Sequence, residues 1–139
     1  MNEKKYSEKE VETKIKQEII GLYEELFKTL WEKIAVTLGG ITLVALFRRI
    51  IRKVSLKYTW MKRVEVGEEG LDFKNLHRKM CESDKEVMKE GFNTVIAELF
   101  SFLTQMTGDI LIGELENIVE KYIPEMKEES RTTNKELIF

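Results

Sequence analysis

The residues whose spacing best suits chemistry are His77 and Cys81, which stand four positions apart. On one helix this spacing places both side chains on the same face, where they could bind a metal or pair a thiol with a base. The sequence holds one histidine and one cysteine in all, so a zinc set lacks ligands and a Ser-His-Asp triad would have to be built on His77 alone. We therefore predict a half-buried cysteine beside a surface histidine, with no enzyme activity, no catalytic residue, no metal site and no cofactor.

Four carboxylates crowd the stretch between Arg63 and Phe73, namely Glu65, Glu68, Glu69 and Asp72. Clustered oxygens suit calcium or magnesium, but their spacing is not that of an EF-hand loop. Neither Gly67-x-x-Gly70 nor Gly39-Gly40 has the lysine and preceding strand of a phosphate-binding loop. A solvated turn is the interpretation that we favour.

Seven basic residues and no acidic one lie between Arg48 and Arg63. With Tyr58 and Trp60 among them, they could follow a nucleic-acid backbone or meet an anionic membrane surface. The net charge of the whole chain is −2, and no recognition-helix motif is present. We favour a solvated face paired to acidic neighbours such as Glu24, Glu25 or the C-terminal helix, then an acidic protein partner. The residues that we assign to partner binding here are Arg48, Arg49, Arg52, Lys53 and Lys57.

A second candidate contact is the apolar run Leu137-Ile138-Phe139, which follows the polar segment 125–136. Its side chains and a carboxylate could dock together in a groove of a partner. Folding back on its own bundle and plain disorder are the alternatives.

The composition favours one helical globular domain. The chain has 139 residues, 42% hydrophobic and 35% charged, with a single proline and eight glycines, which is little turn chemistry for a strand-rich domain. The lone cysteine favours a reducing, cytoplasmic compartment, and the polar first residues do not predict a secretory signal.

The chain is organised around residues 34–47, which carry no charge. Fourteen residues are fewer than the roughly 20 that span a membrane, so we predict a buried core segment and no transmembrane segment. The pair Gly39-Gly40 leaves two possibilities: a break between two helices, or one continuous helix whose glycines admit a close neighbour. We favour the break.

Helical periodicity predicts the elements on either side. A long helix begins near Ser7, where Glu10 completes a capping box, and a helix covers 43–58. A β-hairpin or tight loop is expected within 62–73, and a short helix capped by Asp72 follows it. Ser83 and Glu86 form a second capping box, opening a helix to about Gln105, and Pro124 ends a last helix.

We therefore predict an all-α protein, an antiparallel helical bundle of four to five helices with one short β-hairpin around 62–73. Residues 1–6 are expected to be frayed, 7–124 to form a single helical domain, and 125–139 to be a loose polar tail. The first helix and the 84–106 helix carry apolar faces wider than one seam needs, which favours a homodimer.

The resulting functional hypothesis is a non-enzymatic, cytoplasmic protein-protein interaction or regulatory module. A nucleic-acid-associated protein using 48–63 is the alternative. A weaker one is a small-ligand sensor with an apolar pocket around Gly39-Gly40, Phe47 and Phe92.

Overall fold

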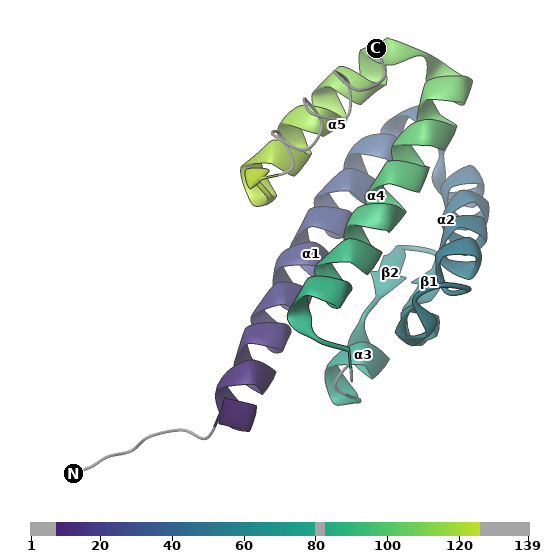
Figure 1. Ribbon diagram of the computed structural model, residues 1–139. Helices are drawn as coiled ribbons and strands as arrows, with labels where there is room; N and C mark the ends of the chain where they lie inside the picture. Colours follow the sequence, from purple (N-terminus) through teal and green to yellow (C-terminus); the bar gives the residue numbers. More distant parts are fainter. Residues whose placement is uncertain (1–7, 80–82, 126–139) are drawn as a thin grey trace.

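A computed structural model of the protein describes residues 8–79 and 83–125. The long helices are α1 (Glu8–Leu38), α2 (Gly40–Val54), α4 (Lys85–Thr107) and α5 (Asp109–Tyr122). Between α2 and α4 lie a 3-10 turn, η1 (Thr59–Arg63), the strands β1 (Glu65–Gly67) and β2 (Gly70–Asp72), and the short helix α3 (Lys74–Arg78). This order confirms the prediction of an all-α bundle with a short hairpin (Figure 1).

The four long helices pack so that contacting neighbours in the order α1, α2, α4 and α5 run antiparallel. Between α2 and α4, Lys53 meets Glu98, and one turn further on Arg49 meets Phe102. Between α5 and α1, the hydroxyl oxygens of Tyr122 and Thr29 lie 2.9 Å apart. The turn joining α1 to α2 and the turn joining α4 to α5 therefore lie at the same end of the bundle (Figure 1).

A single glycine makes each of these two turns. Gly39 ends α1 with φ 83° and ψ 156°, and α2 begins at the next residue. Gly108 separates α4 from α5 with φ 76° and ψ −158°. Only glycine adopts this region of the backbone map without strain, so the Gly39-Gly40 pair is a break between helices, as we favoured, and not a close crossing.

The predicted hairpin forms and lies on α1. β1 and β2 pair antiparallel, with Val66 opposite Leu71 and Gly67 opposite Gly70. A Cβ built on Gly70 would come to 3.9 Å from the Trp31 ring, which places the end of the hairpin against α1. A two-stranded hairpin is marginal on its own, so this packing stabilises it.

The residues predicted to cap α3 and α4 each lie one position before the observed N-cap. The N-cap of α3 is Phe73, whose side chain makes no cap hydrogen bond, and the Asp72 carboxylate before it accepts a hydrogen bond from the backbone N–H of Lys74 at 2.8 Å. The N-cap of α4 is Asp84, which accepts from the N–H of Val87 at 2.9 Å, so the assignment of that cap to Ser83 was wrong. Both residue types cap well, and here the helix begins one residue later.

Aromatic rings from α1, α2, α4, η1 and the segment after β2 meet in the core. Phe92 of α4 stacks on Tyr23 of α1, with ring centroids 4.6 Å apart, and it meets Trp60 of η1 edge-on at 5.1 Å. The ring centroid of Phe27 of α1 lies 6.4 Å from that of Phe47 and 6.1 Å from that of Phe73. This network ties η1 and the segment after the hairpin to the bundle and makes one continuous core.

The broad apolar face of α1 is used mostly within the chain. α1 contacts α2, α4, α5 and β2, and its buried residues include Ile19, Ile20, Leu26 and Ile34. The surplus face that motivated a homodimer is therefore largely covered. Within the described ranges no helix is long and apolar enough to cross a membrane. The predictions for residues 1–6, for the capping residue Ser7 and for the tail after Glu125 lie outside the described residues.

Candidate functional site

The outer face of α2 carries most of the basic residues that we assigned to partner binding. Leu43, Phe47 and Ile50 of this helix are fully buried, which turns the opposite face to solvent. The α2 basic face consists of Arg48, Arg49, Arg52 and Lys53 with Lys57 of the following turn, all exposed.

Few acidic groups neutralise the α2 basic face. The Lys53 Nζ atom lies 2.9 Å from Glu98 Oε1 of α4, so the acidic neighbour is not Glu24 or Glu25. Arg49 lies over the Phe102 ring, with its Cζ atom 5.2 Å from the centroid. In the described part of the chain, no ion pair includes Arg48 or Arg52. The face therefore keeps a positive field that an acidic partner could neutralise.

The end of the bundle beyond Arg48 is apolar and exposed. Ile41 at the start of α2 is 91% exposed, and Ile110 at the start of α5 and Val36 at the end of α1 are each 87% exposed. Met106 of α4 is 51% exposed. We call these four residues the apolar end. Residues 34–47 and 99–108, which lead into the two turns, hold no charged residue, so this end differs from the rest of the surface.

A second basic cluster joins residues that are distant in the sequence. One cleft of about 380 Å³ is lined by Lys62, Arg63, Asn75, Arg78 and Lys79. An adjoining cleft of about 570 Å³ is lined by Thr59, Trp60, Lys62, Arg63 and Ser83. We call the two together the basic cleft, because four of its residues are cations supplied by η1 and by the end of α3.

The scaffold of the basic cleft is well anchored. Trp60 and Met61 of η1 and Leu76 of α3 are buried in the core. Asn75 donates from Nδ2 to Glu65 Oε2 at 2.8 Å, which ties α3 to β1. The indole N–H of Trp60 is buried and has no hydrogen-bond partner among the described residues, a condition that costs on the order of 1–3 kcal/mol.

Sequence reasoning missed this cluster. It treated Lys62 and Arg63 as the end of the basic stretch 48–63, and it did not consider Arg78 and Lys79. The available signal was the basic run His77-Arg78-Lys79 after a hairpin, because a hairpin returns the chain close to the place where it began.

The other candidate residues have structural roles or lie outside the described part. His77 Nε2 lies 3.1 Å from Glu24 Oε1 of α1, so this histidine links α3 to α1. Cys81 and the run Leu137-Ile138-Phe139 fall outside the described residues. Among the residues that the structure describes, no three His, Cys, Asp or Glu side chains are grouped as metal ligands would be.

The residues proposed for an apolar ligand pocket are not brought together. Phe47 and Phe92 are fully buried, and each packs against Phe27. Gly39 and Gly40 lie at the exposed turn, with nothing within 4 Å of a Cβ built on either.

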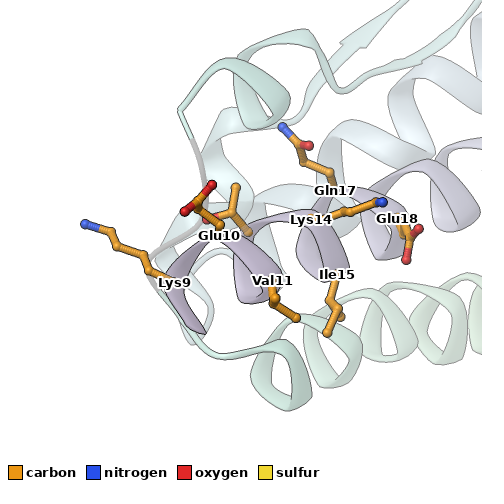
Figure 2. A pocket seen from close by; sticks show the side chains of 8 residues that line it. Lys9, Glu10, Val11, Lys14, Ile15, Gln17 and Glu18 are labelled. Atoms are coloured by element: carbon orange, nitrogen blue, oxygen red, sulfur yellow. The ribbon is translucent and has the colours of Figure 1, made fainter. Parts of the chain in front are cut away.

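The N-terminal half of α1 borders a wide groove of about 910 Å³. Val11 and Ile15 point to one side of the helix, and Glu10 and Gln17 point to the other (Figure 2). The charged residues that line it are Lys9, Glu10, Lys14 and Glu18, two of each sign, so the groove shows no charge preference.

Comparison with known proteins gives no relative: no family model, no curated protein and no solved structure matches the chain.

Proposed function

We propose that the protein is a non-enzymatic interaction or regulatory module that binds an acidic partner protein through the α2 basic face. The observation that carries this proposal is that five exposed cations follow one helix and its turn, while one of them, Lys53, has a carboxylate partner in the described part. Arginine is enriched in protein interfaces because its guanidinium binds carboxylates through two parallel hydrogen bonds.

The apolar end extends this surface. Ile41 lies on the same helix as Arg48, two turns closer to the bundle end. A partner that covered both would bury apolar side chains beside charged ones, which is how protein interfaces are built. The proposal includes a cytoplasmic setting, supported by the single cysteine of the sequence.

Self-association is part of the proposal, with the apolar end as its contact. Exposed apolar residues gathered at one place favour association with a second surface. Sedimentation of the purified chain would show a concentration-dependent dimer, and Ile41→Glu combined with Ile110→Glu would give a monomer. A chain that stays monomeric at every concentration would contradict self-association. A dimer that persists in the doubly substituted variant would contradict the apolar end as its contact.

The test of the main proposal is charge reversal. Partners would be captured from native extract, identified, purified and titrated against the wild type, and against Arg48→Glu, Arg49→Glu and Arg52→Glu combined. A matched control reverses three exposed lysines elsewhere: Lys14→Glu, Lys28→Glu and Lys121→Glu. We expect the α2 variant to lose at least about tenfold in affinity, or 1.4 kcal/mol, while the control keeps its affinity.

Two results would contradict the proposal. Equal loss in both variants would mean that net charge alone matters. Binding to single-stranded or duplex nucleic acid in a mobility shift, lost only in the α2 variant, would assign the face to the alternative function, with a strong salt dependence.

A further inference from the structure

The basic cleft gathers positive charge that no ion pair between described residues neutralises. Arg63 is half-buried, and Lys62, Arg78 and Lys79 are exposed around the same concavity. None of the four takes part in an ion pair of the described residues. Like charges that share a site repel one another, and a bound anion removes that repulsion.

Three carboxylates that lie near the cleft residues in the described sequence accept hydrogen bonds from neutral groups. Glu65 accepts the hydrogen bond from Asn75, and Asp84 caps α4. The Asp72 carboxylate is bound to the backbone of Lys74. Within the described ranges, these three carboxylates therefore have hydrogen-bond partners, whereas none of the four cations has an ion-pair partner.

We propose that the basic cleft is a binding site for a soluble phosphorylated small molecule that carries at least two phosphate groups. The two arginines offer planar, two-pronged donors that match phosphate oxygens, and the two lysines add point charges. Asn75, Ser83 and Thr59 line the cleft with neutral polar groups, which suit the unphosphorylated part of the ligand.

The shape favours a compact ligand over a polymer. The two adjoining clefts have volumes of about 380 and 570 Å³, in the range of pockets that hold small molecules. A nucleic-acid backbone needs cations spaced along a track, whereas these four converge from two elements on one concavity. The proposal concerns a different surface from the α2 basic face, so either can fail without the other.

Trp60 is a natural reporter for this site. It lines the larger cleft, and no described residue supplies an acceptor for its buried indole N–H. Because the ring lines the cleft, a bound anion changes the electrostatic environment of its N–H signal without any movement of the ring. The other tryptophan, Trp31, packs against Phe47 with ring centroids 5.2 Å apart, away from the lining residues of the cleft.

The experiment titrates the full chain with inorganic pyrophosphate at low salt, by calorimetry and by NMR of the two indole N–H signals. A spectrum of Trp31→Phe assigns the signals. We expect saturable binding, a shift of the Trp60 signal and a much smaller shift of the Trp31 signal. Arg63→Gln with Arg78→Gln should weaken binding at least about tenfold, and Arg48→Gln with Arg52→Gln, the matched loss of charge on α2, should change it less than about twofold.

Several outcomes of this titration would contradict a phosphate-binding role for the basic cleft. No binding of pyrophosphate or of a nucleoside triphosphate at millimolar concentration would overturn the proposal, and so would equal weakening in both double variants. Binding only to vesicles that contain a phosphoinositide, or only to long single-stranded nucleic acid, would also overturn it. Because Arg78 is exposed, Arg78→Gln alone supplies the test if the double variant does not fold.

Discussion

At the scale of single residues, Gly91 of α4 leaves the space in which the Trp60 ring of η1 packs. A Cβ at Gly91 would come to 2.5 Å from one carbon of the Trp60 ring and 3.3 Å from Tyr58. The ring is buried against Phe92, so it has little room to move. Gly91 therefore serves a packing role that outweighs its poor helix propensity.

Replacement of Gly91 by alanine should lower stability. Overpacking costs roughly 1–3 kcal/mol, and the gain in helix propensity offsets about 1 kcal/mol of it, so we expect a net loss of up to about 2 kcal/mol in urea unfolding. Gly21→Ala in α1 and Gly113→Ala in α5 are the controls, because nothing lies within 4 Å of a Cβ at either. Each control should gain up to about 1 kcal/mol, and a stabilised Gly91→Ala would contradict the packing argument.

The candidate site shows what residue types and spacing can predict. The α2 basic face follows from helical periodicity, since Leu43, Phe47 and Ile50 fix the buried side and the arginines must then face outward. The basic cleft does not follow, because its two halves meet only through the tertiary packing of η1 and α3. The pairing of His77 with Glu24, which are 53 positions apart, was hidden for the same reason.

At the scale of elements, the two helical hairpins depend on Gly39 and Gly108. Both have positive φ, and neither has a neighbour within 4 Å of a built Cβ. Steric crowding therefore does not select glycine here; backbone conformation does. The elements themselves were predictable, because each apolar run has a clear period and glycine marks each stop. The cap of α4 was not, because Ser83 and Asp84 cap about equally well.

Gly39→Ala should destabilise the fold by on the order of 1–3 kcal/mol, the cost of a side chain in this backbone region. Gly40→Ala is the matched control, since Gly40 belongs to α2, its φ is not positive and nothing lies near its Cβ. It should be neutral or stabilising by up to about 1 kcal/mol. Thermal unfolding at low protein concentration distinguishes the two, and an equal effect of both substitutions would refute a role for φ.

At the scale of the whole molecule, Phe92 connects the parts. Its ring lies near Tyr23, Phe27, Trp60 and Phe73, which come from α1, η1 and the segment after β2. One side chain therefore contacts elements that lie far apart in the sequence. Its removal should lower the stability of the whole fold and not of one element alone.

Phe92→Ala should cost about 3–5 kcal/mol, the usual loss for a fully buried ring. Domains of this size have about 5–15 kcal/mol in total, so we expect a single, early unfolding transition followed by circular dichroism. Phe100→Ala on the same helix removes a half-buried ring and should cost clearly less. Similar losses for both rings would show that Phe92 is not central.

The one-residue turn at Gly39 has a further consequence for how two copies could combine. If residue 39 took helical angles, α1 and α2 would fuse into one rod from Glu8 to Val54, about 70 Å long. α2 could then no longer reach its own α4, but it could pack in the same way on the α4 of a second copy. Such a domain-swapped dimer keeps the contacts between α2 and α4 and alters only the hinge. Gly39→Ala at high protein concentration would favour the domain-swapped dimer. Exchange of α2 would then join two copies through the contact that α2 and α4 already make within one chain.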